Sequence, residues 1–229
     1  MKIYPSLQKP EKIAALLQPL VAGGLELGYC ARTGQVDVRL SASGGDASRL
    51  VNEAEVIVQN TLGSIIYGTD DDELETVVVR LLTERKQTLA LAESCTGGCI
   101  AHRITNVPGA SAVLLAGLVT YSNDAKQKLL GVRADVLAEH GAVSEAVARE
   151  MAGGARRQTG ADFALSVTGI AGPGGGTPAK PVGSVFIALA NASETVVKKN
   201  FNPYDRETFK QVTASQALEL LRRKILATS

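Results

Sequence analysis

The stretch of residues 91–98, which reads LAESCTGG, carries the side chains best suited to chemistry in this chain. The apolar run before it predicts a buried strand and the residues from Gly97 onward predict a helix, so Ser94 is expected at the turn between them. A helix start presents unpaired backbone N–H groups, and Gly97 and Gly98 let a ligand approach them closely. Ser94 and Cys95 would stand beside this anion site, so the turn predicts a nucleophile together with donors for its transition state.

A serine before glycines at a helix start is also an ordinary N-cap, so a catalytic reading needs partners elsewhere in the chain. Lys126 is the best candidate, because a strand ends near Tyr121 and a helix begins after Ser122 or Asn123. The lysine then falls on the first helical turn, where the helix dipole and any burial lower its pKa, as a lysine base requires. The alternative is a solvated surface lysine, which is how Lys128 is interpreted.

Two nucleophiles compete at this turn, and the available base decides between them. Ser94 needs only a neutral amine such as that of Lys126, whereas Cys95 would favour a histidine. His102 lies on the helix that leads away from the turn and is interpreted as a helix-face residue. Serine with lysine is therefore preferred.

Two further segments follow or precede predicted elements at the same sheet edge. Residues 167–177, VTGIAGPGGGT, match neither a Walker loop nor a dinucleotide fingerprint, and they predict a backbone wall around a phosphate or ribose. A mobile linker is the alternative, although the nearby prolines argue against it. Arg206 opens the last helix, where it would clamp a phosphate or form a surface ion pair with Asp205 or Glu207.

Composition limits the classes of function. The chain has 229 residues with 24 basic and 23 acidic side chains, which gives no electrostatic footprint for nucleic acid or an acidic membrane. No apolar run is long enough to span a membrane and no signal peptide opens the chain, so a soluble, cytoplasmic protein is expected. Three cysteines and two histidines form no disulfide framework or metal-ligand cluster. Neither a metal nor a cofactor is expected.

The hydrophobic pattern predicts two domains. Residues 1–68 predict a small α+β domain with helices at 9–20 and 47–61 and strands at 25–31, 35–42 and 64–68. Residues 69–229 alternate strands and helices, which predicts a three-layer α/β/α domain with a mostly parallel, five-stranded sheet. Its strands are expected at 87–92, 113–121, 163–168, 183–190 and 195–200, and its helices at 69–86, 97–105, 123–130, 134–139, 144–159 and 206–226.

These motifs resemble the carboxy-terminal domain of the CinA family (competence- and damage-inducible protein A). The resemblance is carried by residues 92–98, 107–111, 119–126, 141–144 and 167–177, and it spans about residues 70–229. The first 68 residues resemble the KH-type middle domain of full-length members. The larger amino-terminal domain of those members, similar to molybdopterin-binding proteins and associated with ADP-ribose hydrolysis, has no counterpart in this sequence.

The resemblance implies a nicotinamide-nucleotide amidase, which converts nicotinamide mononucleotide to nicotinic acid mononucleotide and ammonia in pyridine nucleotide salvage. It implies Ser94 as nucleophile and Lys126 as base, with Ser111 and Tyr121 assisting. The expected substrate-binding residues are Thr96, Gly97, Gly98, Asn123, Thr168, Gly169, Gly172 and Arg206.

Three alternatives stay open. A non-catalytic nucleotide-binding module would keep the glycine-rich loop, and an amidase for another small carboxamide would share every residue named above. A nucleic-acid-binding role is disfavoured, because the KH-like part lacks a Gly-x-x-Gly loop and its basic residues are scattered. A homodimer is compatible with the sequence, and contacts between domains or subunits would then complete the pocket.

Overall fold

The computed structural model describes residues 1–3 and 10–227. The chain folds into two compact units, Met1–Glu73 and Leu74–Ser229. Each unit is built around a sheet of its own. Within the described residues, no helix combines the length and the apolar character needed to cross a membrane.

The first unit is an α+β fold with one antiparallel sheet in the order β2-β3-β1-β4. Its elements are β1 (Lys2–Ile3), α1 (Pro10–Ala22), β2 (Leu25–Arg32), β3 (Gln35–Ala42), α2 (Ala47–Leu62), η1 (Gly63–Ile65) and β4 (Ile66–Gly68). The predicted hairpin is confirmed, since β2 pairs with β3 from Leu25 opposite Ala42 to Arg32 opposite Gln35. Strand β1 was not predicted, because two residues are too few to show a pattern.

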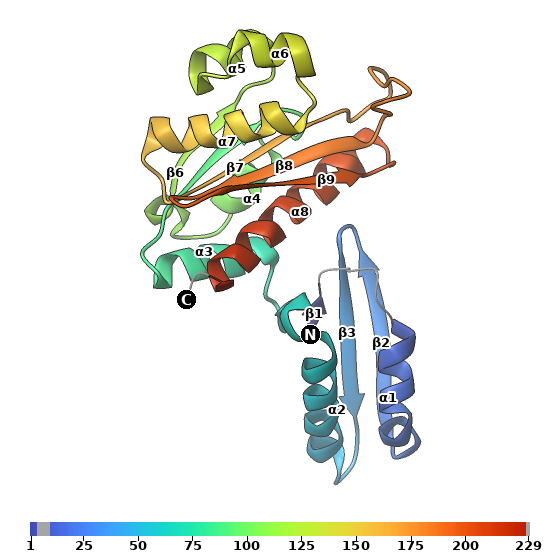
Figure 1. Ribbon diagram of the computed structural model, residues 1–229. Helices are drawn as coiled ribbons and strands as arrows, with labels where there is room; N and C mark the ends of the chain where they lie inside the picture. Colours follow the sequence, from blue (N-terminus) through green and yellow to red (C-terminus); the bar gives the residue numbers. More distant parts are fainter. Residues whose placement is uncertain (4–9, 228–229) are drawn as a thin grey trace. The chain divides into compact units, whose positions relative to one another are not determined.

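The second unit is built on a sheet in the order β6-β5-β7-β8-β9 (Figure 1). Its strands are β5 (Leu89–Glu93), β6 (Leu114–Val119), β7 (Phe163–Gly169), β8 (Ser184–Ala190) and β9 (Thr195–Phe201). β6, β5 and β7 are parallel neighbours, whereas β8 is antiparallel to both β7 and β9. Every residue of β5 and β8 is buried, which explains their uninterrupted apolar sequences.

Helices cover both faces of this sheet. They are α3 (Leu74–Glu84), α4 (Cys99–Thr105), α5 (Asn123–Leu130), α6 (Ala134–His140), α7 (Glu145–Thr159) and α8 (Arg206–Ala227), with the short η2 (Ala110–Ala112). α5, α6 and α7 lie on one side and α3, α4 and α8 on the other (Figure 1). The predicted three-layer α/β architecture with a mostly parallel, five-stranded sheet is confirmed for the described residues.

Two helix starts differ from the prediction. α4 begins at Cys99 because Gly97 and Gly98 have φ angles of 61° and 97°, which a right-handed helix excludes. α3 begins at Leu74 because the Asp72 carboxylate accepts a hydrogen bond from the Thr69 N–H at 3.3 Å. That bond closes a separate turn ahead of the helix. By contrast, α7 has the predicted cap, in which Ser144 Oγ accepts from the Val147 N–H at 3.3 Å.

A close approach between α5 and α7 fixes the helix that carries Lys126. A Cβ atom added at Gly154 of α7 would lie 1.9 Å from the carbonyl oxygen of Leu130, at the end of α5. A Cβ at the neighbouring Gly153 would meet only the guanidinium of Arg157, at 3.2 Å. Gly154 is therefore required by backbone contact, whereas the end of a flexible side chain can move away from residue 153.

We expect Gly154→Ala to lower the free energy of unfolding by about 2–3 kcal/mol, because the two helices must separate. Gly153→Ala is the matched control in the same helix turn. It should be neutral or stabilise by up to about 1 kcal/mol, since alanine favours a helix. Urea denaturation measures both variants, and equal effects of the two would contradict the packing described here.

Candidate active site

The carboxyl ends of three neighbouring strands meet at one edge of the larger sheet. Glu93, the last residue of β5, pairs with Val119 of β6 on one side and with Val167 of β7 on the other. The residues that follow these strand ends therefore emerge together. This edge is where open α/β sheets collect ligands.

Ser94 and Lys126 meet at this edge. Lys126 Nζ lies 3.0 Å from Ser94 Oγ, although the residues are 32 positions apart. The lysine nitrogen also donates to the carbonyl oxygens of Thr120 at 2.8 Å and Tyr121 at 3.3 Å. Ser122 positions the lysine, because its hydroxyl caps α5 by accepting from the Ala125 N–H at 3.0 Å. The sequence predicts that Ser94 and Lys126 lie close together, and the 3.0 Å contact between them agrees with that expectation.

The side chain of Lys126 is buried, and burial lowers its pKa. Only 1% of the residue is exposed, and among the described residues it takes part in no ion pair. Burial lowers the pKa of Lys126 from its ordinary value of 10.5. Lys128 differs as predicted, because its side chain is 72% exposed and pairs with Asp124 at 3.0 Å.

The start of α4 is occupied by a carboxylate of the chain itself. Glu93 is 1% exposed and accepts hydrogen bonds from the N–H groups of Gly98 at 3.0 Å, Ile100 at 3.2 Å and Ala101 at 2.8 Å. The prediction that this helix terminus binds a substrate anion is therefore wrong. The terminus instead holds Glu93, and through it the turn that presents Ser94.

A pocket of about 290 Å³ opens over Ser94 and Lys126. The α6–α7 corner and the loop after β7 provide most of its remaining walls. The residues that line it are Ser94, Cys95, Tyr121, Asn123, Lys126, Ala142, Val143, Thr168, Gly169, Ile170, Ala171, Gly172, Gly174, Gly175 and Arg206. A hollow of about 780 Å³ in the first unit is larger, but it contains none of these groups.

Arg206 lies at the rim of the pocket with its guanidinium held in place. It donates to the carbonyl oxygen of Gly172 at 2.8 Å and to the phenol oxygen of Tyr121 at 2.6 Å. Tyr121 thus contacts Arg206 through its side chain and Lys126 through its main chain. The surface ion pair with Asp205 or Glu207, which the sequence left open, does not occur among the described residues.

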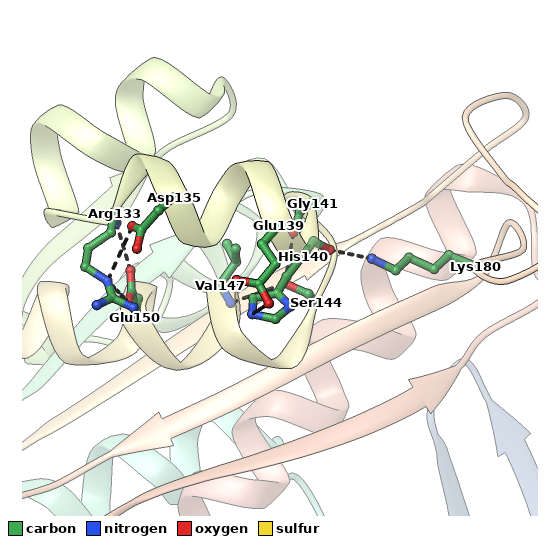
Figure 2. Close-up of polar contacts among 9 residues, drawn as sticks. All are labelled: Arg133, Asp135, Glu139, His140, Gly141, Ser144, Val147, Glu150 and Lys180. Carbon is green, nitrogen blue, oxygen red and sulfur yellow. Dashed lines mark hydrogen bonds and ion pairs between the residues drawn. The ribbon is translucent and has the colours of Figure 1, made fainter.

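Two side chains tie the α6–α7 corner to other walls of the pocket. Thr168, at the end of β7, donates to the carbonyl oxygen of Ala142 at 2.8 Å. Lys180, in the loop after β7, donates to the carbonyl oxygen of His140 at 2.7 Å (Figure 2). The corner that presents Ala142 and Val143 is therefore fixed from two sides.

Four residues expected at the site lie outside the pocket. Ser111 is exposed in η2, just before β6. The six residues of β6 span about 20 Å, and this length separates Ser111 from the carboxyl edge of the sheet. Thr96 is fully buried with its hydroxyl unpaired among the described residues. Gly97 and Gly98 shape the turn around Glu93, and neither lines the pocket.

The competing nucleophile is less suited to attack. Cys95 lines the pocket, but burial raises the pKa of its thiol to about 12, so the reactive thiolate is disfavoured. His102 is exposed on α4 and contacts the Asn106 amide at 3.2 Å. No described contact links it to either candidate nucleophile.

Sequence reasoning missed Glu93, Lys180 and two apolar residues that line the pocket. Glu93 stands inside the motif, and an acidic residue just before a helix start was an available signal for helix stabilisation. Ala142 and Val143 belong to a segment used for the family resemblance, but nothing in apolar side chains points to a site.

Within the described residues, no group of His, Cys, Asp and Glu side chains is arranged to hold a metal ion.

Comparison with known proteins agrees with this architecture. A family model described as the CinA C-terminal domain matches residues 71–225. The chain belongs to the CinA family. A CinA-like protein of Geobacter sulfurreducens is 49% identical over 207 residues, which cover 89% of this chain and 50% of that protein. The chain thus spans about half the length of the curated relatives it matches.

Solved structures of CinA-family proteins share the fold. The competence/damage inducible protein CihA of Agrobacterium tumefaciens aligns with a TM-score of 0.64 and 40% identity, over 68% of this chain and 96% of its own. The competence damage-inducible protein A of Klebsiella pneumoniae aligns with a TM-score of 0.66 and 37% identity, over 69% and 100%. These names describe family membership and no reaction.

The buried carboxylate of Glu93 gives a test of the turn. In Glu93→Gln an amide N–H₂ replaces one acceptor oxygen and faces backbone N–H groups, so we expect a loss of about 2–4 kcal/mol in the free energy of unfolding. Glu145→Gln is the control, because the Glu145 carboxylate also lies at the start of a helix, but its side chain is 62% exposed and pairs with Arg149. Its cost should stay below about 0.5 kcal/mol in urea denaturation.

Proposed function

We propose that this protein is a nicotinamide-nucleotide amidase, which hydrolyses the carboxamide of nicotinamide mononucleotide to nicotinic acid mononucleotide and ammonia. The observation that carries the proposal is the 3.0 Å separation between Lys126 Nζ and Ser94 Oγ at the base of a pocket. The burial of this amine, without a carboxylate partner among the described residues, supports its role as a base.

Acylation uses the hydrogen bonds around Lys126. Once deprotonated, Lys126 keeps two N–H groups for the carbonyl oxygens of Thr120 and Tyr121. Its lone pair can then accept the Ser94 hydroxyl proton across the 3.0 Å contact. Ser94 Oγ attacks the carboxamide carbon while its proton moves to Lys126 Nζ. The tetrahedral intermediate then collapses, the C–N bond breaks, and Lys126 returns the proton to the nitrogen that leaves as ammonia.

In deacylation, water is the nucleophile and Ser94 is the leaving group. Lys126 takes a proton from a water molecule as the water oxygen attacks the ester carbon on Ser94. Collapse of this second intermediate breaks the bond to Ser94 Oγ, which regains its proton from Lys126. The product is nicotinic acid mononucleotide, and both side chains return to their starting state.

The oxyanion needs donors other than the start of α4, because Glu93 already occupies three N–H groups there. The N–H of the residue after a nucleophile often fills this role at a strand-to-helix turn. Here that residue is Cys95, whose N–H donates to no carbonyl among the described residues. We propose it as one oxyanion donor.

Substrate size and charge support a mononucleotide. The pocket of about 290 Å³ lies at the lower end of ligand sites, which typically measure about 300–1,000 Å³. Arg206 presents a guanidinium at the rim, oriented by Gly172 and Tyr121, and guanidinium groups bind phosphate through paired hydrogen bonds. We propose that it binds the 5′-phosphate, with Asn123, Thr168 and Gly169 along the walls.

Every residue to which the proposed reaction assigns a role belongs to the second unit. The identity of the first unit as a KH-like domain, over residues 1–68, stays a proposal based on sequence resemblance.

Replacement of the proposed base tests the reaction. We expect Lys126→Met, which keeps most of the side-chain length but removes the amine, to reduce ammonia release from nicotinamide mononucleotide by about 10²- to 10⁴-fold. Lys128→Met on the same helix is the control and should retain wild-type turnover, since that side chain is exposed. Circular dichroism should show that both variants are folded like the wild type. Wild-type turnover in a folded Lys126→Met variant would remove the proposed mechanism.

The lowered pKa of Lys126 gives the sign of the pH dependence. Because the neutral amine is the base, kcat/KM should rise with pH and level off above the pKa that Lys126 has in the free enzyme. The midpoint should lie below 10.5, the ordinary lysine value, since burial disfavours the charged form. Initial rates from about pH 6 to about pH 10 measure this limb. A profile that falls as the pH increases through this range would contradict a lysine base.

A further inference from the structure

The loop that forms one wall of the pocket has few side chains to hold it. It joins β7 to β8, and Gly172, Gly174 and Gly175 line the pocket from it. Residues 173–179 are exposed. Glycine backbones lose more conformational freedom on ordering than any other residue, so the shape of this wall depends on anchors such as the hydrogen bond from Arg206 to Gly172.

The far end of the loop is a tight turn that fixes the backbone of Lys180. The Thr177 N–H donates to the Lys180 carbonyl oxygen at 2.9 Å, and the Lys180 N–H donates to the Thr177 carbonyl oxygen at 3.1 Å. The Thr177 hydroxyl also accepts from the Lys180 N–H at 3.1 Å. The lysine side chain therefore leaves the loop from a defined position.

The ammonium group of Lys180 reaches the α6–α7 corner, which forms another wall of the pocket. Lys180 Nζ donates to the carbonyl oxygen of His140, the last residue of α6, at 2.7 Å (Figure 2). Carbonyl groups at a helix end lack partners within the helix and carry the negative end of its dipole, so a cation is favoured there. Lys180 itself does not line the pocket, whereas Ala142 and Val143 directly after this helix end do.

We propose that Lys180 is a positioning residue that ties the glycine-rich loop to the α6–α7 corner and thereby sets the width of the substrate pocket. The two walls that it joins belong to different elements and both line the pocket with Ser94, and its side-chain hydrogen bond links the loop to the corner. Loss of the tie removes one anchor of the loop, which Arg206 still holds at Gly172, and it leaves Ser94 and Lys126 untouched. The kinetic consequence rests on the proposed amidase function, but the restraint on the loop does not.

Three variants and a control test this proposal. Lys180→Ala removes the tie, Lys180→Met keeps most of the side chain without the ammonium, and Lys180→Arg restores a cationic donor. Lys198→Ala removes an exposed lysine of β9 and serves as the matched control. Hydrogen exchange measured by mass spectrometry reports on residues 170–183, and ammonia release from nicotinamide mononucleotide gives kcat and KM separately.

In Lys180→Ala and Lys180→Met we expect exchange in residues 170–183 to become roughly three- to tenfold faster, and KM to rise by a similar factor with kcat within about twofold. Lys180→Arg should restore most of both, and Lys198→Ala should match the wild type. Unchanged exchange or an unchanged KM in Lys180→Ala overturns the proposal. If the wild type releases no ammonia, the proposed reaction fails, and the exchange comparison alone still decides whether Lys180 restrains the loop.

Discussion

The site depends on a lysine amine that is buried among neutral oxygen atoms. Lys126 Nζ has two backbone carbonyls and the Ser94 hydroxyl within 3.3 Å, and no carboxylate pairs with it among the described residues. Removal of an amine from water disfavours its charged form, so burial lowers the pKa of Lys126. The parallel β5 and β6 end side by side, so this amine and Ser94 meet although they belong to different segments.

The rest of the larger unit keeps this pair in place through backbone contacts. Glu93 holds the turn before Ser94 by accepting three N–H groups from the start of α4. Gly154 lets α7 approach the end of α5, the helix that carries Lys126. Thr168 and Lys180 fix the α6–α7 corner opposite them. Each restraint orients a wall or a turn and leaves the reacting groups free for substrate.

Much of the fold was predictable because its elements carry strong local signals. Ser144 and Gly160 mark both ends of α7, and the apolar runs of β5, β7 and β8 predict buried strands. The occupant of the α4 terminus was not predictable in the same way. Any anion satisfies a helix start, and only the packed turn shows that the Glu93 carboxylate reaches it.

Only the part of the site that follows from strand topology was predicted. Ser94 and Lys126 follow neighbouring strands, so their meeting could be inferred from topology, and the structure places them 3.0 Å apart. Ser111 precedes the same strand that Tyr121 follows, so the two lie at opposite ends of β6, a consequence that strand length alone implies. The apolar walls at Ala142 and Val143 depend on how the α6–α7 corner packs, which no local pattern encodes.

The central claim concerns both the reacting serine and the nucleotide that it attacks. The most direct measurement is ammonia release by the wild type and by Ser94→Ala, with nicotinamide mononucleotide, nicotinamide riboside and free nicotinamide as substrates. The account predicts fast release from the mononucleotide, much slower release from the two compounds without phosphate, and none above background from Ser94→Ala. Equal release from all three compounds, or substantial turnover by a folded Ser94→Ala variant, would contradict it.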